Sequence, residues 1–162
     1  MHPLFLTWYR VKGKGLYAIS PGTISEIMDL PSTGQFIKQK ITQAKKRESF
    51  CFLIRDKKNN KLVGLIYVLR IDWKIPKAEL GYYIDKSYEG KGITTKAVAK
   101  VIRHCFSELK MNKLFLRTAK SNKGSQRVAL KNGFKREGTL RKDFRMGNGK
   151  LIDIYYYGLV RE

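Results

Sequence analysis

Acidic side chains are scarce in this chain. Its 162 residues include 13 Asp and Glu against 34 Lys and Arg, which gives a formal net charge of +21. A field of this sign concentrates anionic ligands and repels polycations, so acidic partners are favoured. The same charge also fits a solubility feature that has no partner.

Cysteines and long apolar runs are scarce as well. Cys51 and Cys105 lie within apolar patterns without a Cys-x-x-Cys spacing, which argues against a disulfide framework or a zinc site and fits a reducing compartment. The longest apolar stretch, 62–69, is far shorter than the roughly 20 residues that span a bilayer. The first residues lack the basic start and cleavage site of a secretory signal. We therefore expect a cytoplasmic protein without membrane contact.

The two histidines offer little chemistry. His2 and His104 are far apart in the chain, and neither takes part in a Ser-His-Asp or metal-ligand spacing. We expect them to be surface or packing residues, and we expect no metal site.

The periodicity of apolar residues predicts a mixed α/β fold. With 43% hydrophobic residues, the chain can bury one substantial core, so a single domain over 1–162 is expected. Helical spacing joins Phe36, Ile37, Ile41 and Ala44 and recurs at 94–110 and 121–132. Strands are predicted at 4–11, 49–55, 61–73, 78–85, 113–118, 134–140 and 151–160.

The segment Gly90-Lys91-Gly92 is the most informative motif. It follows the apolar strand 78–85 and leads into an amphipathic helix, an arrangement that aims backbone N–H groups at a phosphate, although a plain turn has the same composition. A Rossmann fingerprint needs a third glycine after the first strand, and a P-loop needs four residues between its glycines. Both are excluded, so a different phosphorylated ligand is expected.

Four motifs in order resemble those of the GNAT N-acetyltransferases, in particular the branch that acetylates the N-termini of ribosomal proteins. They cover about residues 35–162 and comprise Ile71-Asp72-Trp73 with 78–83, the segment 88–97, Asn122-Lys123-Gly124-Ser125 with Asn132-Gly133-Phe134, and 148–153. The resemblance implies a mixed, mostly antiparallel sheet of about six to seven strands with about four helices. This sheet would splay between the strands 78–85 and 113–118 and hold acetyl-CoA there.

The resemblance also implies which residues meet acetyl-CoA. Backbone groups of 89–95 would hold its diphosphate, those of Tyr83 and Ile84 would stabilise the oxyanion, and Asn122 would bind the pantetheine arm unless it only caps a helix. The family prefers other residues at two positions of the loop. The loop set is Glu89, Gly90, Lys91, Gly92, Ile93, Thr94 and Thr95, and the departures are Glu89 and Thr94.

Glu79 and Ser125 are the catalytic candidates that the resemblance implies. Glu79 matches a general base acting through water, but it can equally be a partner of a neighbouring lysine. Ser125 matches a serine near the cofactor sulfur, but it can equally be a helix cap. The tyrosine used by many GNAT enzymes is replaced by Ala129, and Asp143 is the nearest match to a second acid.

The acceptor remains open at this stage. A protein N-terminus, such as that of a ribosomal protein, fits the resemblance, and a small-molecule amine is the alternative. A non-catalytic module that binds RNA or the ribosome is the competing class, because Lys96, Lys100 and Arg103 recur at helical spacing. The part before residue 35 is short for the family, which leaves open whether the protein is a monomer or a homodimer.

Overall fold

The computed structural model describes residues 30–57 and 59–162, with side chains from residue 34 onward. The strand expected at 4–11 lies outside the described residues. The described chain forms one six-stranded mixed sheet with three α-helices, which confirms the predicted fold class with fewer helices described than expected. The strands are β1 (Phe50–Arg55), β2 (Leu62–Asp72), β3 (Lys77–Ile84), β4 (Lys113–Ala119), β5 (Lys135–Arg145) and β6 (Leu151–Val160). The helices are α2 (Leu30–Lys45), the short 3-10 helix η2 (Lys86–Tyr88), α3 (Ile93–Ser107) and α4 (Lys123–Lys131).

The strands follow the order β1-β2-β3-β4-β6-β5 across the sheet. Every neighbouring pair is antiparallel except β3 and β4, which run parallel because α3 crosses between them. Strand β5 continues to Arg145, five residues beyond the predicted end. Its pairing with β6 resumes after an irregularity between Leu140 and Phe144, and this interruption hides the strand from a pattern search.

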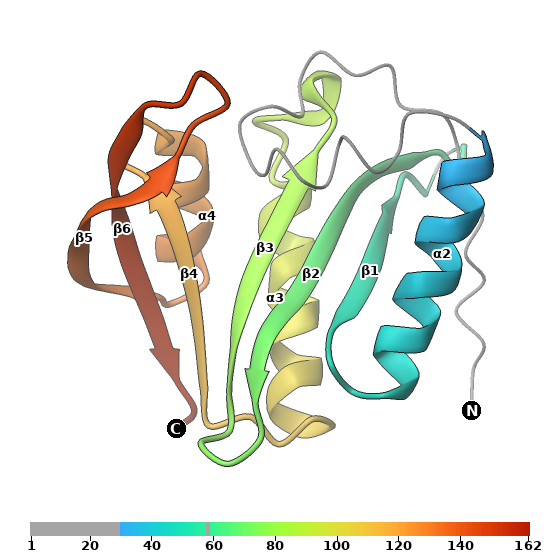
Figure 1. Cartoon of the computed structure of the whole chain (residues 1–162), viewed down its shortest axis with the longest axis horizontal. Coiled ribbons are helices and arrows are strands. Elements are labelled where there is room, and N and C mark those ends of the chain that lie inside the picture. Colours follow the sequence, from blue (N-terminus) through green and yellow to red (C-terminus); the bar gives the residue numbers. More distant parts are fainter. Residues whose placement is uncertain (1–29, 58) are drawn as a thin grey trace.

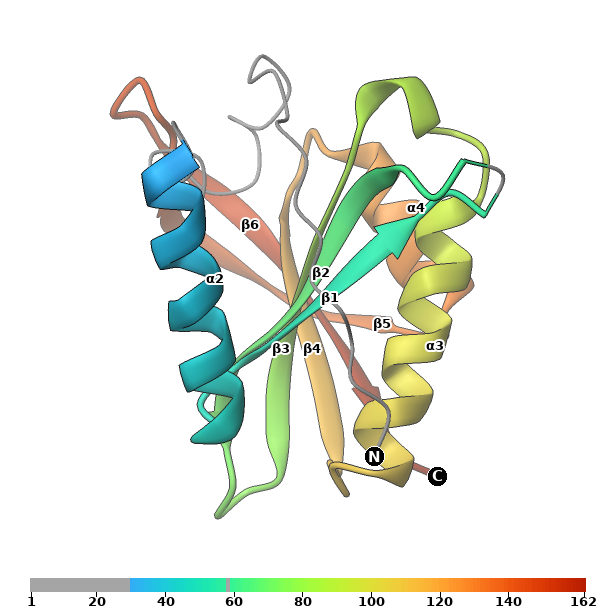
Figure 2. The ribbon, with the colours of Figure 1, turned by 90° about the vertical axis from the view of Figure 1, so that its right-hand side faces the viewer.

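Helices cover both faces of the sheet. Figure 2 shows α2 on one face and α3 with α4 on the other. Helix α3 turns a buried stripe toward the sheet, made of Val98, Val101, Ile102 and Cys105. It ends at Ser107 rather than at residue 110, where Lys110 takes a left-handed conformation with φ of 55°. The predicted amphipathic helix is confirmed, with a shorter C-terminal end.

The main core lies between the sheet and α3 with α4. Its members come from every strand except β5 and are buried, so they remove much apolar surface from water at about 25 cal/mol per Å². The largest fully buried side chains among them are Phe134, Ile66, Leu80, Met111, Leu114 and Leu116. This core fixes where α3 and α4 begin relative to the strands that precede them.

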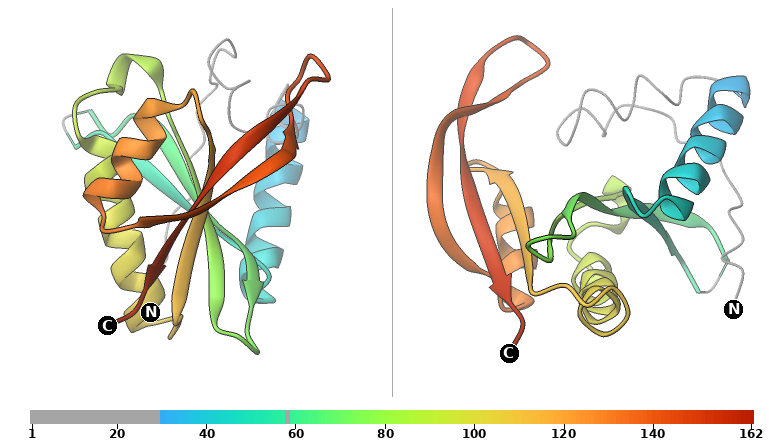
Figure 3. Two further views of the ribbon diagram at one scale, coloured as in Figure 1. Left: turned by 90° about the vertical axis from the view of Figure 1, so that its left-hand side faces the viewer. Right: turned by 60° about the horizontal axis from the view of Figure 1, so that its bottom comes forward.

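The sheet splits between β3 and β4. These strands share only three residue pairs at their first residues, and beyond them the strands separate, as Figure 1 and the right-hand view of Figure 3 show. The pairs are Lys77–Lys113, Ala78–Leu114 and Glu79–Phe115. The predicted splay is confirmed. We call this opening the fork: its closed end is at Glu79, and its open end is where β3 and β4 lead into α3 and α4.

Candidate functional site

One edge of β3 is exposed along the fork. Asp85 donates its backbone N–H to the carbonyl of Val63 on the β2 side over 2.7 Å, and the carbonyl of Tyr83 lies directly against Gly64 of β2. Because peptide groups alternate in direction along an antiparallel strand, those of Tyr82 and Ile84 face the fork instead. β4 has no paired residue opposite them. The fork is therefore lined by strand backbone that can pair with a ligand.

The loop after β3 is built around two glycines. Gly90 and Gly92 both have φ of 73°, a conformation that costs other residues about 1 kcal/mol or more. A Cβ added at either position would meet no atom within 4 Å, so the space above the loop is open. Their role is thus to set the backbone conformation and to leave room beside it.

The loop leads into the N-terminus of α3. The first intrahelical bond runs from Lys96 N to the carbonyl of Gly92, so the N–H groups of Ile93, Thr94 and Thr95 precede the helical ladder. Gly92 occupies the cap position and has no side chain to satisfy them, and the first turn contains no acidic residue. Together with the helix dipole, this makes the start of α3 a suitable place for an anion.

The first residues of the loop are fixed by their own hydrogen bonds. Asp85 accepts from both the N–H and the hydroxyl of Ser87, at 2.9 and 2.6 Å, and these bonds lower the pKa of its carboxyl. Glu89 donates its N–H to the carbonyl of Lys86 over 3.2 Å. Lys91 folds back so that its Nζ donates to the carbonyl of Ser87 over 2.9 Å. The backbone N–H of Glu89 is therefore already used, whereas its side chain is exposed.

The second strand of the fork leads into α4 through Asn122 and Ser125. Asn122 caps α4, because its Oδ1 accepts from the backbone N–H of Ser125 over 3.0 Å. The hydroxyl of Ser125 in turn lies 2.9 Å from the hydroxyl of Tyr82 on β3. The Tyr82 side chain thus bridges the fork from β3 to α4.

Tyr82 is a site residue that the sequence analysis missed. Burial raises the pKa of its hydroxyl to about 12, so the hydroxyl is neutral near pH 7. It donates either to the carbonyl of Ser125 at 3.1 Å or to its Oγ. The apolar strand pattern gave no signal for this contact, because it depends on how far β3 and β4 separate.

Glu79 lies at the closed end of the fork and is buried, with 8% of its surface exposed. Its carboxylate forms an ion pair with Arg70 of β2 and accepts from Nε of Arg117 on β4 over 3.0 Å. The same Arg117 donates to Asp143 of β5 over 3.1 Å. The ion-pairing alternative for Glu79 thus describes its contacts, although its partners are arginines rather than lysines. The sequence analysis did not single out either arginine.

An aromatic pair borders this charged cluster. Phe115, opposite Glu79 in the ladder, stacks on Tyr156 of β6 with ring centroids 5.0 Å apart and planes at 13°. Tyr156 lies directly opposite Arg117 in the β4–β6 ladder, so both point to the same face of the sheet. This is the α2 side, away from α3 and α4.

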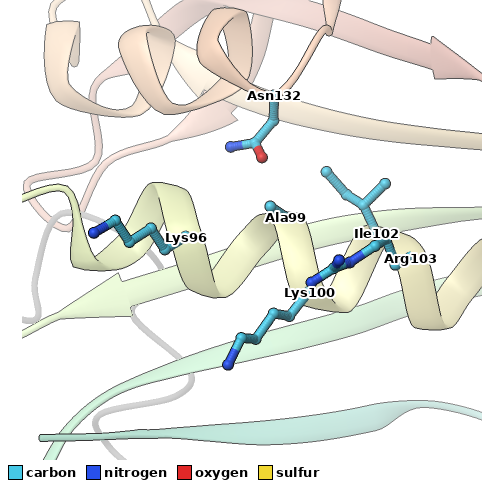
Figure 4. A pocket seen from close by; sticks show the side chains of 6 residues that line it. All are labelled: Lys96, Ala99, Lys100, Ile102, Arg103 and Asn132. Carbon is cyan, nitrogen blue, oxygen red and sulfur yellow. The ribbon is translucent and has the colours of Figure 1, made fainter.

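A separate cleft lies between α3 and the end of α4. It has a volume of about 520 Å³ and is lined by Lys96, Ala99, Lys100, Ile102, Arg103 and Asn132. Figure 4 shows Asn132 pointing from the end of α4 toward α3, where its amide donates to the carbonyl of Thr95 over 3.3 Å. The three basic residues that the sequence placed on one helical face thus border one cleft.

The remaining sequence candidates lie outside the fork. His104 packs against Phe52 in an edge-on contact with centroids 5.5 Å apart, and both cysteines are free thiols. Within residues 30–57 and 59–162, no group of three His, Cys, Asp or Glu side chains is arranged to hold a metal ion. The described helices include none that is long and apolar enough to cross a membrane.

Comparison with known proteins identifies the family. Residues 20–135 match the acetyltransferase (GNAT) domain. The chain is similar to Bacillus subtilis YdaF, whose provisional name is ribosomal N-acetyltransferase, with 38% identity over 103 residues, covering 64% of this chain and 56% of YdaF. The chain belongs to the GNAT acetyltransferase family, as the sequence resemblance implied.

Solved structures share the fold. The ribosomal-protein-S5-alanine acetyltransferase of Vibrio fischeri superimposes with a TM-score of 0.84 at 24% identity, covering 91% of this chain and 80% of that one. The microcin C7 self-immunity acetyltransferase MccE, in complex with acetyl-CoA and AMP, gives a TM-score of 0.76 at 26% identity over 85% of this chain and 74% of MccE. The chain spans 56–63% of the length of three curated relatives that it matches, YdaF among them.

Proposed function

We propose that this protein is an acetyl-CoA-dependent N-acetyltransferase that transfers the acetyl group directly to an amine, best matched by the N-terminal amine of a ribosomal protein. The observation that carries the proposal is the fork between β3 and β4, with an anion-binding helix start at its open end and a buried carboxylate at its closed end. Acetyl-CoA would supply a thioester whose carbonyl carbon accepts the amine.

The open end of the fork fits the diphosphate of coenzyme A. The backbone N–H groups from Gly90 to Thr95 lie where the glycines leave space above the chain, and the dipole of α3 adds a positive potential. The N–H of Glu89 is committed to Lys86, so this residue would border the diphosphate without donating to it. Thr94 would contribute its backbone N–H, and this contribution does not depend on the identity of its side chain.

The exposed edge of β3 fits the pantetheine arm and the reacting carbonyl. Alternation turns the peptide group of Ile84 toward the fork and that of Tyr83 toward β2. Of the two candidates, Ile84 is therefore the better oxyanion donor, with Tyr82 on the same edge. The side-chain oxygen of Asn122 is engaged in the helix cap, which leaves its NH₂ group for an amide carbonyl of the arm.

Ser125 is the proposed proton donor to the departing thiolate. Its hydroxyl lies 2.9 Å from that of Tyr82, which stays neutral because burial raises its pKa to about 12. A proton passed on by Ser125 can be replaced from Tyr82, and solvent would later restore the Tyr82 proton. Tyr82 is thus a positioning residue that acts through Ser125.

Glu79 is the proposed base, acting through a water between its carboxylate and the incoming ammonium. The two guanidinium groups of Arg70 and Arg117 fix the carboxylate at the closed end, on the face of the sheet that carries α2. Direct transfer is favoured over an acyl-cysteine route, because burial raises the pKa of Cys51 to about 11 and that of Cys105 to about 12. Neither thiol would be a ready nucleophile near pH 7.

The proposed acceptor rests on similarity to relatives named after ribosomal-protein substrates and on the charge of the chain. A net charge of +21 repels polyamines, whereas a single N-terminal amine on a peptide meets a weaker penalty. The aromatic pair Phe115–Tyr156 beside Glu79 offers an apolar wall for the first side chain of such a peptide.

Calorimetry with acetyl-CoA is the first test, and thiol release with peptides that copy ribosomal-protein N-termini is the second. We expect saturable binding of acetyl-CoA and turnover with free peptides, but none with the same peptides blocked at the N-terminus. No heat of binding would contradict the cofactor assignment. Turnover with small amines and not with peptides would replace the proposed acceptor by a small molecule.

A further inference from the structure

The described helices share an unusual charge distribution. None of α2, α3 and α4 contains an Asp or a Glu, so every acidic residue that the structure describes lies on a strand, in a loop or at a chain end. The exposed side chains of α3 include Lys96, Lys100 and Arg103. Those of α4 include Lys123, Arg127 and Lys131. The layer formed by α3 and α4 is therefore basic along both helices.

The two helices lie side by side on one face of the sheet (Figures 2 and 3). The cleft between them is bordered on the α3 side by Lys96, Lys100 and Arg103, and Figure 4 shows the side chains of Lys96 and Lys100 extending from α3 away from Asn132. Its floor includes the small side chain of Ala99 and the apolar side chain of Ile102. The outer surface is thus a groove of about 520 Å³ with cations along its rim, which we call the basic groove.

We propose that the α3–α4 layer, with its basic groove, docks the phosphate backbone of an RNA. A nucleic-acid backbone is a ridge of regularly spaced negative charges, and ammonium or guanidinium groups along a groove can neutralise several phosphates at once. That the nucleic acid is RNA rests on the proposed acceptor, because an enzyme that meets a ribosomal protein also meets ribosomal RNA.

The shape and polarity of this face favour RNA over an anionic membrane. Membrane-surface helices present large apolar side chains beside their cations. Among the outward-facing residues of α3 and α4, Leu130 is the exposed large apolar one, with 58% of its surface exposed. A membrane surface is also flat on this scale and would not enter a groove, whereas a phosphate ridge does.

The location of the basic groove leaves the proposed acceptor side free. The groove lies on the outer side of α3 and α4, whereas Glu79, Arg117 and Tyr156 face the opposite side of the sheet. An RNA bound to the helices would therefore not cover the proposed entrance for the amine. It would instead hold the enzyme beside a protein that is itself bound to that RNA.

The test is fluorescence anisotropy with a labelled RNA hairpin at several salt concentrations. The test variant combines Lys100→Gln, Arg103→Gln, Arg127→Gln and Lys131→Gln, which avoids Lys96 in the first turn of α3. The matched control combines Lys38→Gln, Lys45→Gln, Lys46→Gln and Lys57→Gln, an equal loss of charge from exposed residues away from α3 and α4.

We expect wild-type binding that weakens steeply with salt. The test variant should bind about tenfold or more weakly, with the slope of log K against log salt reduced by about 3, and the control should stay near wild type. Equal weakening of both variants would overturn the proposal, because net charge would then explain binding. Displacement of the RNA by coenzyme A, or equally groove-dependent binding to phosphatidylserine vesicles, would also overturn it.

Turnover on a short peptide separates this proposal from the proposed function. The test variant should keep wild-type peptide acetylation, since none of its four residues lies in the fork. If the wild type acetylated peptides but did not bind RNA, only the docking proposal would be overturned. If the wild type bound RNA through the basic groove but acetylated no amine, only the proposed acetyltransferase function would be overturned.

Discussion

The open end of the fork is bordered by backbone groups, whereas its closed end is bordered by charged side chains. At the open end, Gly90 and Gly92 set the conformation, and the N–H groups that start α3 provide the positive potential. At the closed end, Glu79 is held by Arg70 and Arg117, which reach it from two other strands. One end depends on local conformation, and the other depends on the register of the sheet.

This difference predicts different responses to mutation. A backbone site tolerates most side-chain changes around it and fails when its φ angles are no longer allowed. A buried charge cluster tolerates no loss of one partner, because the remaining charge stays desolvated. Mutations at the open end should therefore mainly change ligand affinity, whereas mutations at the closed end should change turnover and stability.

Glu79→Gln should have the largest effect. We expect kcat to fall by about 10² or more, the usual contribution of a general base, with acetyl-CoA affinity unchanged. Steady-state kinetics and calorimetry measure the two quantities, and Glu137→Gln, in the more exposed pair with Lys113, is the matched control. A loss of stability with normal kcat would show that Glu79 only supports the fold.

The double variant Gly90→Val, Gly92→Val should affect the open end alone. Positive φ costs a residue with a Cβ about 1–2 kcal/mol per position, so affinity for acetyl-CoA should fall roughly 100-fold. Because the added side chains meet no atoms, the free loop can relieve the strain by taking other φ angles, so the cost falls mainly on binding and the thermal midpoint should change less than the affinity. Gly147→Val, in an exposed turn, is the control, and unchanged binding by the double variant would contradict the loop assignment.

Arg117→Met should lower stability more than affinity. It removes one of two partners from buried Glu79 and the partner of Asp143, so the free energy of unfolding should fall by about 2 kcal/mol, below the cost of a fully isolated buried charge. Urea unfolding measures this change. Arg141→Met, at an exposed position on β5, should be neutral. If both variants were equally stable, the cluster would not support the closed end.

Tyr82→Phe should give the smallest change near pH 7. The lost hydrogen bond to Ser125 should cost about 1 kcal/mol of stability, with a fall in kcat that exceeds any change in KM. Because the folded-state pKa is raised from 10.0 to about 12, the stability tied to neutral Tyr82 is complete below pH 10 and is lost as pH rises to 12.

Unfolding at neutral and alkaline pH therefore separates the roles of Tyr82. Wild type should lose more stability than Tyr82→Phe between pH 10 and 12, while Tyr155→Phe should follow the wild type. Parallel pH curves for wild type and Tyr82→Phe would contradict the buried bridge.

The open end could be predicted from the sequence because its determinants are consecutive. Two glycines between a strand pattern and a helix pattern are visible without any knowledge of neighbours. The sequence analysis also gave helix capping as the alternative role of Asn122. A cap involves only the next three residues, so it too can be read from consecutive residues. Local geometry is encoded locally, and motif reading recovers it.

The closed end could not be predicted in this way. Leu69 lies opposite Glu79, so in a regular strand Arg70 would point to the other face. The register irregularity after Leu69, with φ of 47° at Arg70, is what allows Arg70 to pair with Glu79. The sequence of the segment 69–72 contains no glycine, proline or other signal that predicts this irregularity. The contact of Arg117 likewise depends on the three-pair ladder between β3 and β4.

The short ladder between β3 and β4 has a mechanical consequence. Three residue pairs, the Glu79–Arg117 ion pair and the Tyr82–Ser125 bridge link β3 to β4 and α4 across the fork. With so few links, its two sides can behave as separate cooperative units in the native state. Amide hydrogen exchange should then alternate along β3, fast at Tyr82 and Ile84 and slow at Gly81 and Tyr83. A ligand inserted in the fork would act as a removable strand, closing the sheet and slowing the fast amides.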